Sequence, residues 1–403
     1  MRKRFLNQAE ILILFIIWPF LSLIAACGQF QNKRTRFICV LFGTLFGYTF
    51  VVANESIDSY RYALEFQDYC NEVNDWGEWL EMTLSIKGLQ LIIPLIYTVV
   101  SFFSNDYHVV FAIFGMLFSY FMIKTVGVLY DSNKNNSTVL KLLLIIFLLS
   151  LNFIFNINGA RMWVAMWITC YSLLSYWSGL LSKFRCYILL AMTMFVHWSF
   201  LFVFLLFIFY ENMHIKKENL LYVLLIISFV IRPFFVSIVQ NVPFLGGFYE
   251  HKIMAYTSTE SSDILESSRQ NASFLYGIYR SAFAPAVLIL LIYVRRGIIF
   301  CRNAIMKEIY YFALVAFIFV NVGANTYEVE RFLVLFECVA VFFIYSALDV
   351  MPLNKKRFIF VCMIPLLAFS IAKSMLLGRV VTSLNLFLPA PFYWLQSANG
   401  VIY

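Results

Sequence analysis

Charged side chains are scarce in this chain of 403 residues: only 13% are Asp, Glu, Lys or Arg, whereas 62% are hydrophobic. Soluble domains average about 25% charged residues, so the composition excludes a water-soluble protein. Apolar runs long enough to cross a bilayer, about 17–25 residues each, recur between Ile11 and Leu376. The sequence therefore predicts an all-α fold, a single polytopic helical bundle over residues 1–403 that is embedded in a membrane and has no soluble module.

Patterns that bind metals or form disulfide frameworks are also missing. None of the eight cysteines stands in a CxxC pair, and only Cys70 falls in a long polar loop. No second His or Cys stands at ligand spacing from His197, so we expect no metal and no other cofactor. The net charge of +8 does not indicate nucleic-acid binding, because the basic residues form short clusters between apolar runs, as in cytoplasmic loops.

About ten to twelve membrane segments are expected from the number of such runs. The clearest candidates are 11–27, 37–52, 108–130, 139–155, 161–181, 220–239, 277–294, 309–323, 332–348 and 358–376. Two more apolar segments, 88–103 and 187–210, fit either a full span or a segment that enters the membrane and returns. The polar stretches predict two larger periplasmic loops, at 53–107 and 240–276.

Lys and Arg set the orientation of membrane spans, because they favour the cytoplasmic side. Residues 53–87 carry eight acids and two bases, and a basic cluster at 33–36 precedes them, so we expect 53–87 outside. The basic clusters near 183–185, 216–217, 295–307 and 355–357 all reach the cytoplasm only if 88–103 and 187–210 do not cross. This topology leaves Arg2, Lys3 and Arg4 outside.

One arginine, Arg161, lies at the seam between two apolar stretches, in NFIFNINGARMWVAMW (152–167). An arginine at mid-membrane costs about 2.5–3.5 kcal/mol on insertion scales, and less near the interface. One interpretation is an interfacial anchor. The other is an anion site, since Gly159 and Ala160 let backbones approach, a helix start offers N–H groups, and a guanidinium binds phosphate through two parallel hydrogen bonds.

The stretch NESIDSYRYALEFQDY (54–69) is the second candidate. If it is helical, Asp58, Arg61 and Glu65 share one face, because residues three and four apart are neighbours. Aromatic residues interleave with them, namely Tyr60, Tyr62, Phe66 and Tyr69. Sugars are bound by aromatic faces together with carboxylates, so this stretch is either a saccharide cradle or an exposed acidic loop with a local ion pair.

Two arginines in the second half are expected at the outer start of a span. Arg280 lies in QNASFLYGIYRSAF, and Arg331 lies in NTYEVERFLVLF beside Glu328 and Glu330. With Arg161 they make three cations on the outer side, against the bias of basic residues towards the cytoplasm. We interpret their convergence as a site for an anionic ligand, and diphosphate is favoured over carboxylate because it accepts more guanidinium contacts.

Three landmarks, taken in order, resemble the Wzy-type bacterial polysaccharide polymerases of the EpsG-like branch. They are DSYRYALEF (58–66), NGARMWVAMW (158–167) followed by SKFR, and FVHWSF (195–200). Their order and spacing match over residues 37–210, and ERF at 330–332 adds weaker support. The paired R-x10-G loops of some members have no copy here.

The resemblance implies a metal-independent membrane glycosyltransferase similar to the GT-C type. Such enzymes move a growing glycan from undecaprenyl diphosphate onto a new lipid-linked repeat unit at the periplasmic face of the bacterial inner membrane, with an inverting-type transfer and with a chain-length regulator and a flippase as partners. The site we expect has Arg161, Arg280 and Arg331 on the diphosphate, Arg61, Tyr60, Glu328 and Glu330 on the substrate, and His197 or Asp58 as the base.

Two other classes of membrane protein stay open. A transporter or flippase of lipid-linked oligosaccharides needs similar outer cations, but it predicts internal repeats that the sequence does not display. A membrane O-acyltransferase would explain a lone histidine in an apolar helix, although its donor site favours the cytoplasmic side.

Overall fold

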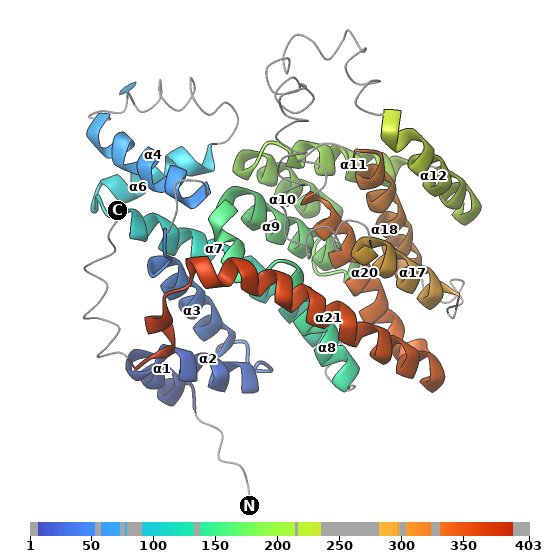
Figure 1. The fold of residues 1–403 in the computed structure, drawn as a ribbon, viewed down its shortest axis with the longest axis horizontal. Helices are drawn as coiled ribbons and strands as arrows, with labels where there is room; N and C mark the ends of the chain where they lie inside the picture. The colour runs from blue at the N-terminus through green and yellow to red at the C-terminus, as the bar shows by residue number, and fades with distance from the viewer. Residues whose placement is uncertain are drawn as a thin grey trace, which may run out of the picture. The chain divides into compact units, whose positions relative to one another are not determined.

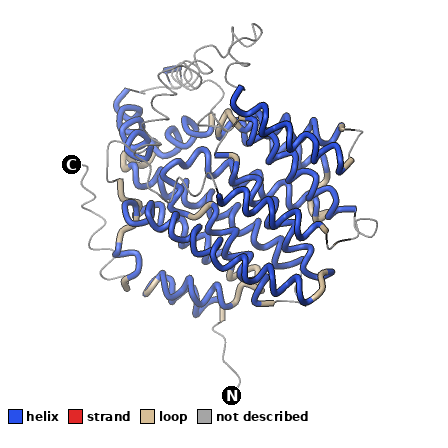
Figure 2. The backbone as a smooth tube through the Cα atoms, turned by 45° about the vertical axis from the view of Figure 1, so that its right-hand side comes forward, coloured by secondary structure: helices blue, strands red, loops and turns tan. Residues whose placement is uncertain are grey.

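The computed structural model describes residues 7–52, 58–72, 77–78, 91–132, 138–213, 217–234, 282–296, 298, 304–323 and 331–389. Within these ranges the chain is helical almost throughout, and one isolated bridge, between Phe50 and Thr382, is its only β pairing (Figures 1 and 2). Five helical stretches are long and apolar enough to cross a membrane: Tyr107–Ser132, Val139–Trp177, Ala304–Val322, Leu333–Val350 and Leu353–Val381. The predicted all-α membrane fold is confirmed.

The chain divides into two compact units. Unit 1 comprises residues 1–135, 152–201 and 374–403, and unit 2 comprises residues 136–151 and 202–373. Because each unit has its own internal packing, we describe each by itself. The expectation of one domain stays a prediction.

Unit 1 begins with two short helices where the sequence predicts one span, 11–27. Helices α1 (Gln8–Ile17) and α2 (Pro19–Gly28) are separated at Trp18. Pro19 begins α2, and because proline has no backbone N–H it cannot donate the hydrogen bond that would extend α1. The Ser22 hydroxyl donates to the Ile11 carbonyl at 2.8 Å, so α2 turns back along α1. The predicted single span is therefore wrong, and the segment is a hairpin whose ten-residue arms are too short to cross.

Helices α3 (Arg36–Tyr48) and α7 (Tyr107–Ser132) form the tightest pair of unit 1. Gly43 and Gly47 face Gly115 and Ser119, and a Cβ added at Gly47 would overlap the Phe111 carbonyl. Small residues at this spacing let two membrane helices approach closely.

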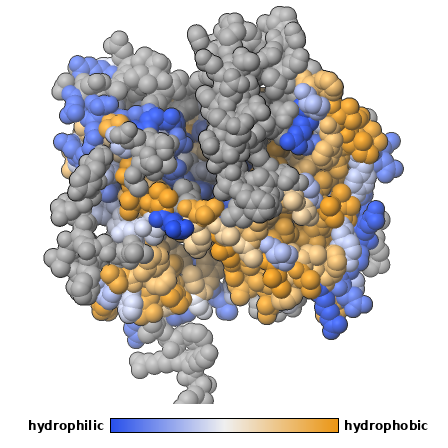
Figure 3. Space-filling view, viewed as in Figure 1, coloured by the Kyte–Doolittle hydropathy of each residue, from blue (hydrophilic) through white to orange (hydrophobic). Residues whose placement is uncertain are grey.

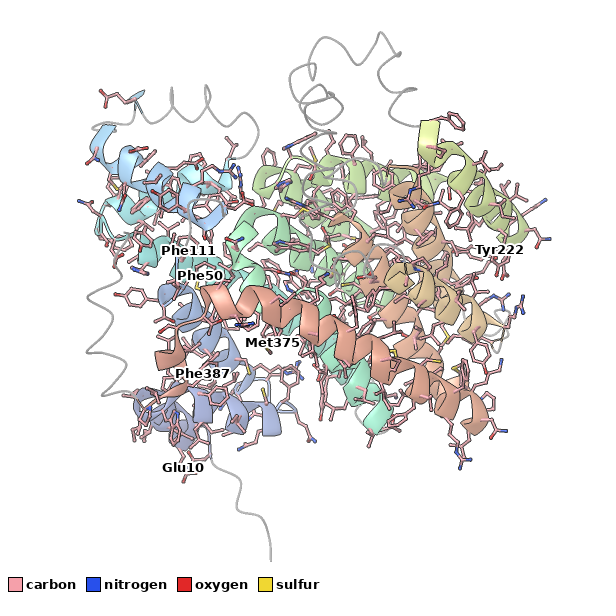
Figure 4. All side chains as sticks on the ribbon, in the orientation of Figure 1. Glu10, Phe50, Phe111, Tyr222, Met375 and Phe387 are labelled. Atoms are coloured by element: carbon pink, nitrogen blue, oxygen red, sulfur yellow. The ribbon has the colours of Figure 1, made fainter. Side chains whose placement is uncertain are left out.

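The two helices of this pair run antiparallel. Arg36 at the start of α3 forms a bidentate ion pair with Asp131 at the end of α7, with distances of 2.9 and 2.7 Å. At the opposite ends the rings of Phe50 and Phe111 stack with centroids 5.2 Å apart (Figure 4). The basic end at Arg36 is the expected cytoplasmic one, so the Phe50 end is the expected outer one.

Two helices from the predicted outer loop pack on this end. Helix α4 (Asp58–Glu72) lies within 53–87, and α6 (Ile92–Ser101) is the only helix described in 88–103. Ten residues span about 15 Å, half of the hydrocarbon core, so α6 is too short to cross. The structure favours the non-crossing alternative for 88–103.

The rest of unit 1 follows α8 (Val139–Leu151) in the chain, a helix of unit 2. A 3-10 turn, η1 (Ile154–Gly159), leads into α9 (Ala160–Trp177), and α10 (Lys183–Val196) follows. This part of unit 1 ends at Leu201, and α11 (Phe200–Asn212), which begins after a break at His197–Ser199, continues into unit 2. The apolar stretch 187–210 is thus two helices of 14 and 13 residues rather than one span.

Unit 2 is built of apolar helices whose ends are joined by ion pairs. It contains α8, most of α11, α12 (Glu218–Ile231) with η2 (Arg232–Phe234), α17 (Ala284–Arg295), α18 (Ala304–Val322) and α20 (Leu333–Ala347) with η6 (Leu348–Val350). Ion pairs of 2.6 Å join Arg295 to Glu218 and Lys141 to Asp349. Each ion pair therefore joins two helix ends, and both include a basic residue of the kind that favours the cytoplasmic side.

Helix α21 (Leu353–Val381) contains Pro365 and is followed by η7 (Leu384–Phe387). Large apolar side chains along it are exposed, among them Phe358, Val361 and Ile364. Apolar side chains cover much of the described surface (Figure 3), which suits contact with lipid tails.

Candidate functional site

Arg161 occupies the first turn of α9, on the expected outer side of unit 1. Gly159 ends η1 and caps α9 without a side-chain hydrogen bond. The Arg161 Nε donates to the Tyr62 hydroxyl at 3.0 Å, and the guanidinium carbon lies 5.1 Å from the centre of the Tyr62 ring. The arginine is half-buried, so it is held in one orientation rather than extended freely into the interface.

Tyr62 is held in place by contacts with Phe114 and Tyr97. It is 2% exposed, its ring lies 5.9 Å from that of Phe114 in an edge-on contact, and its backbone carbonyl accepts a hydrogen bond of 3.1 Å from the Tyr97 hydroxyl. Burial raises the pKa of Tyr62. Its hydroxyl is therefore neutral at physiological pH, and it orients Arg161 without neutralising it.

Helix α4 presents its charged residues together, as its spacing predicts. Arg61 Nη2 lies 3.0 Å from Asp58 Oδ1, and Arg61 Nε lies 3.9 Å from Glu65 Oε1. The Asp58 and Arg61 side chains are 37% and 54% exposed. The predicted shared face is confirmed, and the Asp58 carboxylate and the Arg61 guanidinium on it are accessible.

The predicted saccharide cradle is wrong for three of its four aromatic residues. Tyr62, Phe66 and Tyr69 are buried and dock α4 onto unit 1. Phe66 and Tyr69 lie 5.4 and 5.9 Å from the Tyr97 ring, and the Tyr69 hydroxyl is 2.7 Å from Thr98 Oγ1. A stripe at positions i, i+4 and i+7 of an amphipathic helix is the pattern of a buried face. Tyr60 is half-buried.

An apolar cavity of about 250 Å³ lies beside Arg161. It is lined by side chains of α6, α7, α9 and α10, and Arg161 is the one charged residue among the described residues of its wall. Met192 and Phe195 of its wall are 53% and 40% exposed. The cavity therefore reaches the lipid-facing surface at α10, with a guanidinium in its wall.

His197 directly follows two residues of that wall, Phe195 and Val196. The imidazole is buried, and its Nδ1 lies 2.6 Å from the Ser199 hydroxyl. This contact fixes the ring at the break between α10 and α11. The sequence places His197 in an apolar run. In the structure this residue lies at the end of α10, next to the cavity that Arg161 lines.

The described structure does not test whether the predicted site residues of the second half of the chain join this cluster. Arg331 lies two residues before α20 and belongs to unit 2. Arg280, Glu328 and Glu330 lie outside the described residues, so the convergence of three arginines stays a prediction. In the described part of the chain no group of three His, Cys, Asp or Glu side chains could hold a metal, and metal independence also stays a prediction.

Comparison with known families decides what kind of protein this is. The model of the EpsG family matches residues 34–388. The chain belongs to the EpsG family. No curated protein and no solved structure matches it.

The EpsG match runs from just before α3 to η7 and includes every candidate site residue. EpsG membership makes the chain a multi-pass, polysaccharide-polymerase-like membrane protein. It confirms the resemblance drawn from DSYRYALEF, NGARMWVAMW and FVHWSF, whose residues Asp58, Arg161 and His197 all lie in unit 1.

Two residues of the candidate site have contacts that the sequence does not reveal. Tyr62 is expected as a sugar-facing ring, but it is the buried partner of Arg161. Trp163 is expected only as part of an apolar helix, yet its indole lies beside Gly159. The helical stripe of Tyr62, Phe66 and Tyr69 is the signal from which the first role follows.

Proposed function

We propose that this protein is a polysaccharide polymerase of the bacterial inner membrane. In this proposal it transfers a growing glycan from undecaprenyl diphosphate onto a new lipid-linked repeat unit at the periplasmic face. The observation that carries the proposal is the position of Arg161, an oriented guanidinium in the wall of an otherwise apolar cavity that reaches the lipid.

The shape of the substrate fits this arrangement. A prenyl diphosphate has an apolar chain and a charged head, and a cavity with one cation in an apolar wall offers a place to both. Burying each CH₂ group of the chain contributes about 0.8 kcal/mol. The guanidinium binds phosphate oxygens through charge-assisted hydrogen bonds, and α9 adds the positive end of its dipole next to Arg161.

The reaction needs a leaving group, a nucleophile and a base. An acceptor hydroxyl attacks the anomeric carbon of the donor glycan, the bond from that carbon to the diphosphate breaks, and the diphosphate leaves with the electron pair. Arg161 stabilises the charge that develops on the diphosphate. The acceptor proton passes to a base, for which the candidates are Asp58, close to Gly159, and His197, which directly follows the cavity residue Val196.

A deletion strain complemented with the gene tests the proposal. We expect surface polysaccharide to shorten from a ladder to a single repeat unit on a gel, and complementation to restore the ladder. Loss of a flippase would leave no repeat unit at the surface, and loss of an acyltransferase would leave full-length chains. Either of these results would contradict the proposed function.

A further inference from the structure

Trp163 and Asp58 approach Gly159 from two sides and leave only a narrow space between them, which the absence of a side chain at Gly159 keeps open. A Cβ added at Gly159 would lie 3.2 Å from Cδ1 and Nε1 of the Trp163 indole and 3.6 Å from Asp58 Oδ2. The indole Nε1 and the carboxylate oxygen are therefore at most about 7 Å apart. No hydrogen bond joins them in the described part of the chain, and they are near enough for one polar ligand to bridge them.

The polar atoms at this space are available. Asp58 Oδ1 accepts from Arg61 at 3.0 Å, so Oδ2 is the oxygen that faces Gly159. Among the described residues, none accepts a hydrogen bond from the Trp163 indole N–H, and the Trp163 side chain is half-buried. The space thus offers an aromatic ring, one donor, one acceptor and the exposed cation of Arg61.

Three asparagines hold this space in place. Asn156 Nδ2 donates to Asn152 Oδ1 at 2.9 Å, and Asn152 Nδ2 donates to the Trp163 carbonyl at 3.2 Å. Asn158 Oδ1 accepts from the backbone N–H of Ser59 at 3.2 Å, next to Asp58. The start of α4 and the first turn of α9 are therefore tied to η1. A membrane-interface anchor would not need such ties, whereas a binding site needs preorganised walls.

We infer that Trp163, Gly159, Asp58 and Arg61 form a saccharide subsite for the acceptor sugar of the lipid-linked repeat unit. The sugar ring packs on the indole, one of its hydroxyls accepts from Nε1–H, and another donates to Asp58 Oδ2. The inference rests on the proposed function, since it names the part of the substrate that binds at Trp163, two positions after Arg161 in the chain. The aromatic surface for the sugar is thus the Trp163 ring on α9, and α4 contributes charged residues to the subsite in place of its aromatic ones.

Substitutions at Trp163 separate a sugar platform from a lipid anchor. Trp163→Leu keeps an apolar side chain but removes both the ring and the Nε1–H donor, whereas Trp163→Phe removes the donor and keeps a ring. We expect Trp163→Leu to raise the apparent KM for lipid-linked repeat units about tenfold, the upper end of the loss of one aromatic contact, and Trp163→Phe to raise it less. Phe103→Leu is the matched control, because Phe103 is an exposed aromatic residue of the same unit.

Gly159→Ala provides a second test. The backbone of Gly159 has φ −104°, outside the left-handed region that favours glycine. The added methyl group would lie 3.2 Å from the Trp163 indole, so it would push the ring by a few tenths of an ångström and narrow the space between Trp163 and Asp58. We expect shorter chains and a raised KM. Gly28→Ala is the control, because a Cβ there would meet nothing within 4 Å.

The measurement uses the full-length protein in proteoliposomes, supplied with lipid-linked repeat units extracted from the deletion strain. If the wild-type protein makes a ladder and both Trp163→Leu and Gly159→Ala keep the wild-type KM, the subsite is refuted while the polymerase remains. If Trp163→Phe is as impaired as Trp163→Leu, the ring is not the binding element and the inference also fails. If the wild-type protein makes no ladder, the proposed function itself fails.

Discussion

Replacing Arg161 by lysine keeps the positive charge but removes the planar, forked donor. In the wild-type protein Nε is held at 3.0 Å by the Tyr62 hydroxyl, and the guanidinium lies 5.1 Å from the Tyr62 ring, so the remaining N–H groups have a fixed direction. An ammonium group has no such fork and binds phosphate as a point charge. The substitution therefore isolates geometry from charge.

The expected loss can be estimated from the hydrogen bonds that disappear. One charge-assisted hydrogen bond contributes about 1.5–3 kcal/mol, which corresponds to roughly a ten- to 150-fold fall in rate if the bond is made in the transition state. Insertion should not change, because lysine and arginine have similar costs at membrane depth, about 2.5–3.5 kcal/mol on insertion scales.

The assay for Arg161→Lys is the initial rate of polymer formation in proteoliposomes, with immunoblots of membranes as the measure of insertion. Arg185→Lys is the matched control, since Arg185 is exposed at the start of α10 on the expected cytoplasmic side. A wild-type rate and wild-type chain lengths in Arg161→Lys would refute the role of the oriented guanidinium.

Four further predictions follow from the same structure. Tyr62→Phe keeps the ring but removes the acceptor for Arg161 Nε, so we expect a loss of about 0.5–1.5 kcal/mol, read as a two- to tenfold slower rate with normal insertion. Gly47→Ala forces a methyl group against the Phe111 carbonyl and should destabilise the α3–α7 pair by about 1–3 kcal/mol, measured as a lower melting temperature, whereas Gly28→Ala should melt as the wild type does. Asp58→Asn and His197→Gln distinguish the two base candidates, because only the loss of the true base should lower kcat by about 10²–10⁴-fold; equal and small effects of both would exclude both. Because α2 turns back along α1, a tag fused before Gln8 should be protected from protease added outside spheroplasts, and cleavage there would refute the hairpin topology.

The fold class was predictable because hydropathy is the strongest signal in a membrane protein. The sequence also predicts the pairing of Asp58 with Arg61, which depends only on helical spacing. It does not predict the division of 11–27, since the turn at Trp18 and Pro19 interrupts a run that hydropathy reads as continuous. A proline near the middle of an apolar run is the local signal for such a turn.

The candidate site was predictable only in part. Arg161, Asp58 and His197 stand out because ionisable residues are rare in apolar surroundings. The residues that contact them could not be predicted in this way. Tyr62 lies 99 positions before Arg161 in the chain, and no local pattern connects two residues so far apart. The role of Trp163 depends on the missing Cβ of Gly159 and on the position of Asp58 across the space, both of which are tertiary features.

Photo-crosslinking is the most direct test of whether the cavity beside Arg161 holds a prenyl diphosphate. A prenyl diphosphate with a photoreactive group in its chain is illuminated with the full-length protein in proteoliposomes, and the labelled peptides are sequenced. The account predicts labels on the cavity wall, at residues such as Val164, Ile168 and Met192, and a clear loss of labelling in Arg161→Ala. Labelling confined to other helices, or labelling of the wall that Arg161→Ala leaves unchanged, would contradict it.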